Sequence, residues 1–176
     1  MKTIKKTAAF LLAFALAFTL VGCSSGEIDG LLSNTKTPKS VIKAYYKSIQ
    51  KTDEETYIEY LPEYKKVAYT YDDINLEDAV EETLKNELDN FEDEYGDDIK
   101  IKLDDIIVEE TSDDYLIAVR IAQEFFQVDD VEISDATKVK FDITVKGDDG
   151  YAEGRGEAFL YKENGKWKVS KTDVEF

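Results

Sequence analysis

The apolar residues change their spacing once along the chain, close to Gly96. Before this glycine they recur every three or four residues, as on one face of an amphipathic helix. After it they recur mostly at every second residue, which is typical of strands with one buried face. Helices followed by strands with short connections predict an α+β domain, in which the helices pack on a strongly curved antiparallel sheet.

Two segments of the first half have strong helical patterns. Thr37 can cap a helix that begins at Pro38 and runs to about Lys51, because proline at the first helical position loses no hydrogen bond. Asn75 can cap a longer helix that ends at Tyr95. The first helix has an apolar face of Val41, Ile42, Tyr45, Tyr46 and Ile49 and an opposite face of Lys39, Lys43, Lys47 and Lys51.

The segment between these helices is less clearly marked. Asp53 can cap a short helix that stops before Pro62. The apolar residues of segment 63–71 fit helical spacing, but some of them also alternate as in a strand. Both interpretations of this segment remain open.

Five strands are expected after Gly96. The candidates are residues 99–108, 115–125, 139–145, 151–163 and the segment from 166 onward. The apolar phase shifts near Asp104-Asp105, which predicts a bulge. Asn164-Gly165 predicts a two-residue hairpin turn, which places Lys162 opposite Trp167 and Leu160 opposite Val169.

The N-terminal segment has the three parts of a secretory signal. Three lysines, at positions 2, 5 and 6, precede an apolar run from Ala8 to Val21. The run is too short for a comfortable membrane span, which needs about 20 residues. The motif Leu20-Val21-Gly22-Cys23 is similar to the lipobox of bacterial lipoprotein precursors. The alternative is an ordinary secreted protein that has a chance cysteine near the cleavage site.

The resemblance to lipoprotein precursors implies a diacylglyceryl thioether on Cys23 and cleavage just before it. The chain would then be anchored to the outer face of the bacterial cytoplasmic membrane. Residues 1–22 would be the signal peptide, 23–36 the lipidated cysteine with a flexible tether, and 37–176 one α+β domain. Because Cys23 is the only cysteine, disulfides and thiolate sites are excluded from that domain.

The charge of the chain limits its partners. The formal net charge is −17, and removal of the three signal lysines would take it to −20. Such a surface repels nucleic acid, which binds clustered Lys and Arg, so we expect no nucleic-acid partner. It is also repelled by anionic lipid, so we expect the domain to stand off the membrane on its tether. The charge serves solubility, or alternatively it binds cations or a basic partner.

We expect neither a metal nor a cofactor. The chain has no histidine, which is the commonest metal ligand and the usual general base. Five pairs of adjacent aspartates follow Gly96, but none matches the spacing of a calcium-binding EF-hand loop. The acidic outer face of the helix that ends at Tyr95 is expected to be solvated, with a cation or partner surface as the alternative.

Residues at both ends of the domain resemble the small lipoproteins of the nuclear-transport-factor-two-like superfamily. The resemblance lies in Thr37-Pro38, Val41, Tyr45-Tyr46, Ile49, Asp53, Asn164-Gly165, Trp167 and Val169. Members share an opening helix that begins at proline and a closing strand with Gly-x-Trp-x-Val. The resemblance covers residues 37–176 and implies a cone-shaped, cystatin-like fold, in which a curved sheet wraps around helices and leaves a pocket at its open end.

The resemblance allows two classes of function. The first is a non-catalytic binding or interaction domain for a small apolar ligand or an envelope protein, as a monomer or a homodimer. Tyr46, Phe125, Phe141 and Trp167 are the candidate residues for its pocket or interaction surface, and simple packing is the alternative for them.

The second class is a small-molecule enzyme, since ketosteroid isomerases and scytalone dehydratase of that superfamily carry acids, bases and donors inside the cone. A Tyr–carboxylate site is conceivable, because an apolar pocket raises the pKa of a carboxyl group. However, no carboxylate falls in an inward-facing row, so we expect no enzyme. A cone filled by its own side chains would favour the binding domain, and a deep pocket with a buried, unpaired acid would favour the enzyme.

Overall fold

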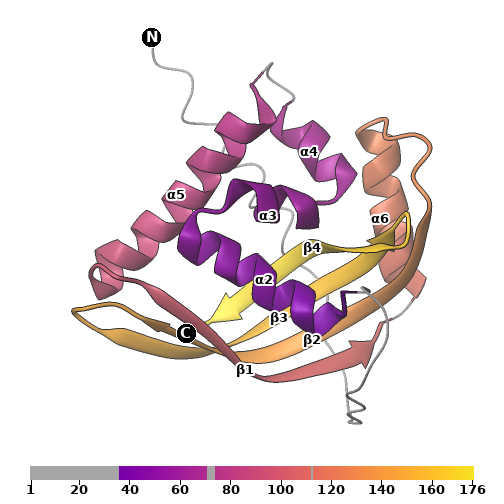
Figure 1. Ribbon diagram of the computed structural model, residues 1–176. Coiled ribbons are helices and arrows are strands. Elements are labelled where there is room, and N and C mark those ends of the chain that lie inside the picture. Colours follow the sequence, from indigo (N-terminus) through magenta and orange to yellow (C-terminus); the bar gives the residue numbers. More distant parts are fainter. Residues whose placement is uncertain (1–35, 71–73, 112) are drawn as a thin grey trace.

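The computed structural model describes residues 36–70, 74–111 and 113–176, and Figure 1 shows helices lying over one face of an antiparallel sheet. The expected signal segment, Cys23 and the tether up to residue 35 lie outside these residues. The described helices are α2 (Pro38–Lys51), α3 (Glu54–Tyr60), α4 (Glu63–Tyr69), α5 (Leu76–Tyr95) and α6 (Asp113–Phe125). The strands are β1 (Lys100–Glu110), β2 (Ile133–Lys146), β3 (Tyr151–Glu163) and β4 (Lys166–Glu175). The predicted α+β class is confirmed.

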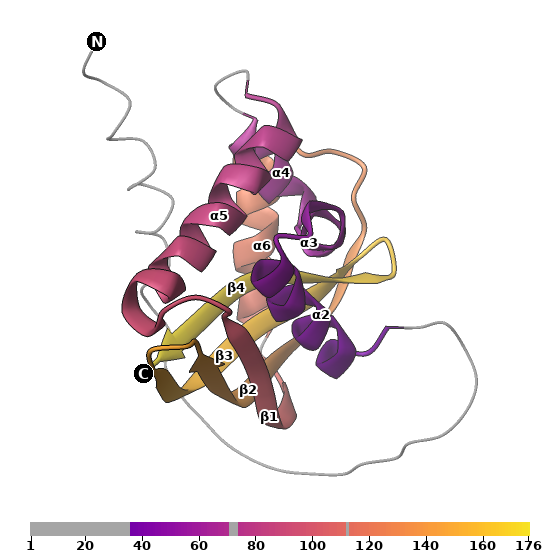
Figure 2. The same ribbon diagram turned by 60° about the vertical axis from the view of Figure 1, so that its left-hand side comes forward.

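The four described strands form one antiparallel sheet in the order β1-β2-β3-β4. The turn at Asn164-Gly165 is confirmed, since Lys162 pairs with Trp167 and Leu160 with Val169. The register of β1 against β2 shifts between Asp104 and Ile107, as the sequence predicts. Figure 2 shows how the sheet bends beneath α2.

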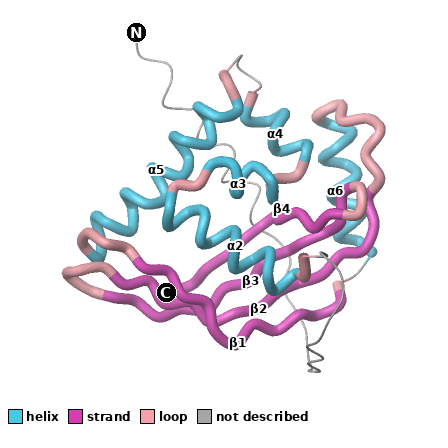
Figure 3. Tube along the Cα trace, viewed as in Figure 1, coloured by secondary structure: helices cyan, strands magenta, loops and turns pink. Residues whose placement is uncertain are grey.

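The second expected strand, residues 115–125, is wrong, because residues 113–125 form helix α6. Its buried side chains, Val119 and Gln123, are four residues apart, which is a helical spacing. The row expected to face inward in a strand comprised Tyr115, Ile117, Val119, Ile121 and Phe125. Val119 is buried, but Ile117, Ile121 and Phe125 are 50%, 61% and 78% exposed. A continuous run of apolar residues fits the 3.6-residue period of a helix as well as the two-residue period of a strand. The pattern therefore does not distinguish a strand from a helix. Figure 3 shows α6 apart from α2, α3 and α5.

The local sequence explains where the helices begin and end. Thr37 and Ser40 form a reciprocal capping box around the first turn of α2, and Thr52 closes that helix in the left-handed conformation, with φ 48°. The Asp53 side chain caps α3 and Asn75 caps α5, both as expected. The open question about residues 63–71 is answered for 63–69, which are helical in α4.

The main core lies between the concave face of the sheet and the apolar face of α2. Val41 and Ile42 of α2 are fully buried, and so are Val139 of β2 and Leu160 of β3. Several tyrosines of the helical half contribute rings to this core rather than to the surface. Tyr45 stacks on Tyr57 at a centroid distance of 5.0 Å, and their hydroxyl oxygens lie 3.1 Å apart. The helix is therefore held by burial along its whole inner face.

Replacement of Ile42 by alanine should destabilise the domain by about 2–5 kcal/mol, because it leaves a cavity in a fully buried site. Urea unfolding followed by circular dichroism measures this loss. Ile121→Ala is the matched control, because it makes the same change at a side chain that is 61% exposed. It should shift the free energy of unfolding by no more than about 0.5 kcal/mol. Equal losses in the two variants would contradict this description of the core.

Candidate functional site

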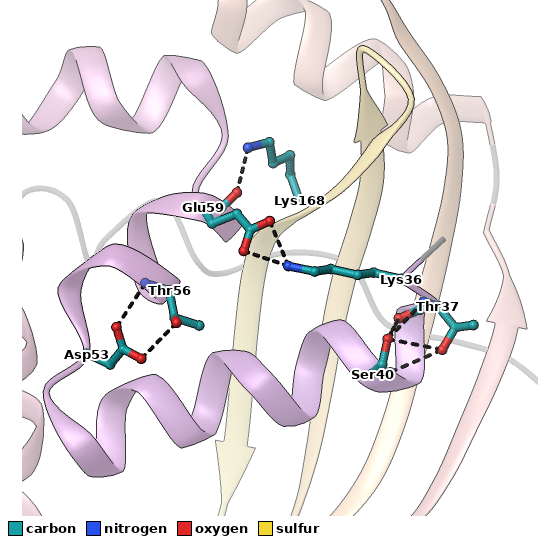
Figure 4. Close-up of polar contacts among 7 residues, drawn as sticks. All are labelled: Lys36, Thr37, Ser40, Asp53, Thr56, Glu59 and Lys168. Carbon is teal, nitrogen blue, oxygen red and sulfur yellow. Dashed lines mark hydrogen bonds and ion pairs between the residues drawn. The ribbon is translucent and has the colours of Figure 1, made fainter. Parts of the chain in front are cut away.

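An open groove of about 360 Å³ lies between α2 and α3. Its lining comprises Lys36, Ala44, Lys47, Ser48, Lys51, Asp53, Thr56, Glu59 and Tyr60. Figure 4 shows the polar contacts of the helices that form its walls. Five of the nine lining residues are charged, whereas the pockets that bind small molecules are lined mainly by hydrophobic and aromatic side chains.

One wall of the groove belongs to the lysine face of α2. Lys39, Lys43, Lys47 and Lys51 recur every four residues, so they form one row along the helix. All four are exposed, and none forms an ion pair with another described residue. We call these four residues the lysine row.

The acids on the opposite wall already have partners. Asp53 accepts hydrogen bonds from the backbone N–H of Thr56 at 3.1 Å and from its hydroxyl at 2.8 Å, and these bonds lower the pKa of Asp53. Glu59 accepts from Lys36 Nζ at 2.7 and 2.6 Å, and this bond raises the pKa of Lys36 (Figure 4). Lys168 Nζ donates to the backbone carbonyl of Glu59 at 2.6 Å. Lys47 and Lys51 form no ion pair with another described residue, although the charge of Lys51 also contributes to the lowered pKa of Asp53.

The four residues proposed from sequence for a pocket are only partly brought together. Tyr46 and Phe141 are in edge-to-face contact, with ring centroids 5.4 Å apart, and both are buried in the core. Trp167 packs against the same core, and Lys162 Nζ lies 5.1 Å from its ring. Phe125 lies on α6 and is 78% exposed, because its segment is a helix and not an inner strand.

A buried Tyr–carboxylate pair is present at a place that the sequence pattern does not reveal. Glu163 is 4% exposed, and it accepts a hydrogen bond from the Tyr161 hydroxyl at 2.6 Å. Both carboxylate oxygens also lie 3.1 Å from the backbone nitrogen of Glu63, in the first turn of α4. Burial, together with the charge of Glu163, raises the pKa of Tyr161 well above its ordinary value, so this phenol stays protonated. The expectation that no carboxylate points inward is wrong at Glu163.

The surroundings of this pair contain further aromatic and polar side chains. Tyr115 of α6 stacks on Phe159 of β3 at 4.9 Å, and the Tyr64 and Ser170 hydroxyls lie 2.8 Å apart. The Tyr115 hydroxyl and Gln123 Nε2, both on α6, are buried and have no hydrogen-bond partner in the described part of the chain. A second small core therefore lies beside α6.

A wider hollow of about 840 Å³ lies on the sheet near the C-terminus. Its charged residues are Asp104, Asp105, Asp142, Glu153, Arg155 and Glu175. Within residues 36–70, 74–111 and 113–176, no group of three or more possible ligands is arranged to hold a metal ion. The hollow is therefore an acidic surface, with Arg155 Nε 3.8 Å from Asp142 Oδ1.

Comparisons with known proteins find no match among family models, curated proteins or solved structures. No helix in the described ranges is long and apolar enough to cross a membrane.

Removal of the buried charge at Glu163 should destabilise the fold. Glu163→Gln keeps the shape of the side chain but weakens the charged hydrogen bonds with Tyr161 and with the first turn of α4. We expect a loss of about 1–3 kcal/mol in the free energy of unfolding, measured by urea denaturation. Glu153→Gln, at an exposed position of the same strand, is the control and should change little. If both variants were equally stable, Glu163 would have no structural role.

Proposed function

We propose that this chain is a bacterial lipoprotein that is anchored through Cys23 to the outer face of the cytoplasmic membrane. The support is the order of lysines, apolar run and Leu20-Val21-Gly22-Cys23 motif at the N-terminus. Two acyl chains give stable anchoring, because each buried CH₂ contributes about 0.8 kcal/mol. The domain from residue 37 onward would then stand outside the cell.

The domain is, in this proposal, a non-catalytic binding or interaction module. The observation that carries the proposal is that the concave face of the sheet is filled by the protein's own side chains. Val41 and Ile42 of α2 and Phe141 of β2 are buried there, at the place where a cone-fold enzyme would hold its substrate. Binding would therefore use an outer surface, such as the groove between α2 and α3.

We also propose that the domain is a variant of the nuclear-transport-factor-two-like cone. In its favour, α2 begins at Pro38, and the last two strands form the Asn164-Gly165 hairpin with Trp167 and Val169 beside the core. Helix α6 stands where a further strand was expected. The variant thus has four described strands, and α6 lies between β1 and β2 in the chain.

The second candidate function is an enzyme with a Tyr–carboxylate site at Tyr161 and Glu163. It is favoured by the unpartnered polar atoms of Tyr115 and Gln123 on the neighbouring helix. Against it, Glu163 is hydrogen-bonded through both oxygens, and neither of the two hollows described above includes this residue. The carboxylate is thus held in the fold by Tyr161 and Glu63, so we favour the binding module.

The mass of the intact protein after extraction from membranes tests the anchor. The wild-type chain should begin at Cys23 and be heavier by a diacylglyceryl group, because the motif directs both acylation and cleavage. Cys23→Ala is the control and should lack this gain. A wild-type mass without lipid would contradict the lipoprotein proposal and leave a freely secreted acidic domain.

A further inference from the structure

The strongest positive charge of the described chain lies on its first helix. Residues 36–51 contain five lysines and neither Asp nor Glu, although the whole chain has 39 acidic residues and a net charge of −17. The lysine row (Lys39, Lys43, Lys47 and Lys51) extends along about 18 Å of α2, from the rise of about 1.5 Å per residue. This protein of negative net charge therefore has a positively charged surface along one side of α2.

The row is not neutralised by the fold. Like charges four residues apart repel each other along a helix, and the row contains three such pairs. Of the nearest acids, Glu59 is paired with Lys36. Asp53 stays charged while it accepts from Thr56, and the charge of Lys51 helps to lower its pKa, so Asp53 acts on the Lys51 end of the row. Lys39, Lys43 and Lys47 form no ion pair with another described residue and keep their charge for an anion outside the domain.

The row also belongs to the helix closest to the anchor along the chain. Twelve residues lie between Cys23 and Lys36, and the segment from Cys23 to Lys36 spans at most about 45 Å when fully extended. A lipid on Cys23 would therefore hold Lys36, which directly precedes the lysine row in the chain, within this distance of the bilayer surface. The acidic outer face of α5 lies further along the chain, with Glu81, Glu82, Asp89 and Asp93 exposed.

We propose that the lysine row is a docking surface for the anionic lipid headgroups of the membrane that holds the chain, and this rests on the proposed lipid anchor. Each lysine near an anionic bilayer favours the bound state by about fivefold in the equilibrium constant. The anchor supplies a high local concentration of lipid, so a weak interaction suffices. The remaining acidic surface is repelled by the same headgroups, which turns the lysine row toward the bilayer and the acidic surface away from it.

The distance between the domain and the membrane then differs from what its composition predicts. Net charge alone predicts that the whole domain stands off an anionic membrane. The distribution of charge gives a different result, because the Debye length at physiological salt is about 8 Å and each face responds mainly to the charges near it. The domain should lie on the membrane through α2 rather than hang free.

The test uses the mature chain, produced without its signal and coupled through its only cysteine to a maleimide lipid. Vesicles are made either of phosphatidylcholine or of equal parts phosphatidylcholine and phosphatidylglycerol. A water-soluble amine-reactive acetylating ester is added, and mass spectrometry measures the rate at each lysine. We expect the lysine row to react about fivefold more slowly on the anionic vesicles, and 500 mM NaCl should remove the difference.

Lys85, Lys100, Lys146 and Lys166 are the internal control, because they are exposed and form no ion pair with another described residue. Their rates should be the same on both vesicles. Equal rates for the lysine row on both vesicles, or equal protection of both sets, would overturn the proposal. Equal protection of the row by soluble polyphosphate with neutral vesicles would also overturn it, in favour of an anionic polymer as the partner.

A second readout separates charge from folding. Energy transfer from Trp167, the only tryptophan, to a dansyl-labelled lipid should rise on anionic vesicles. Replacing the lysine row by four glutamines should abolish the rise, while four glutamines at the control positions should preserve it at the same net charge. Glutamine has a helix propensity close to that of lysine, so α2 should stay folded. Because the coupling is chemical, a negative result here leaves the acylation of Cys23 in the cell unaffected.

Discussion

The fold depends on the burial of one face of α2 against the concave side of the sheet. This helix supplies fully buried residues such as Val41 and Ile42, and it contacts α3, α5 and three of the four strands. A domain without disulfides has only such burial to offset the entropy lost on folding. Because α2 occupies the concave face of the sheet, no ligand can bind at that face while the helix is packed there.

Helix α2 has two faces, a buried apolar face and an exposed lysine face. Apolar residues at helical spacing build the core, and lysines at the same spacing build the outer face. Glu59 of α3 pairs with Lys36, and no described acid forms an ion pair with the row. An acidic protein can therefore present a cationic surface in one place. The net charge describes the protein as a whole, but a charged partner interacts mainly with the face that lies closest to it.

Much of the architecture could be predicted because local rules and packing agree. Proline at position 38, aspartate at 53 and asparagine at 75 mark helix starts through backbone chemistry that does not depend on distant contacts. The Asn164-Gly165 turn set the register of β3 against β4 for the same reason. The segment of α6 was not predictable in this way, because its continuous apolar run fits both periods and its exposed face is also apolar.

Less of the candidate site than of the fold could be predicted from the sequence. The lysine row was visible as a pattern, but its unpaired state depends on what α3 places beside it. Glu163 was missed because its burial depends on α4, whose first residue, Glu63, donates its backbone N–H to this carboxylate although it lies 100 residues away in the chain. Phe125 was proposed for a pocket on the basis of a strand that does not form.

Native-state hydrogen exchange tests the central claim, that α2 closes the sheet, most directly. If α2 is an integral part of the core, amides of Ile42 and Tyr46 should exchange only through global unfolding, with the same free energy as Val139 and Phe141 of β2. The account predicts this equality under native conditions and a parallel decrease with urea. Exchange of the α2 amides at a free energy several kcal/mol below that of β2 would contradict it. Such a result would mean that the helix opens separately and that the concave face of the sheet is available to a ligand.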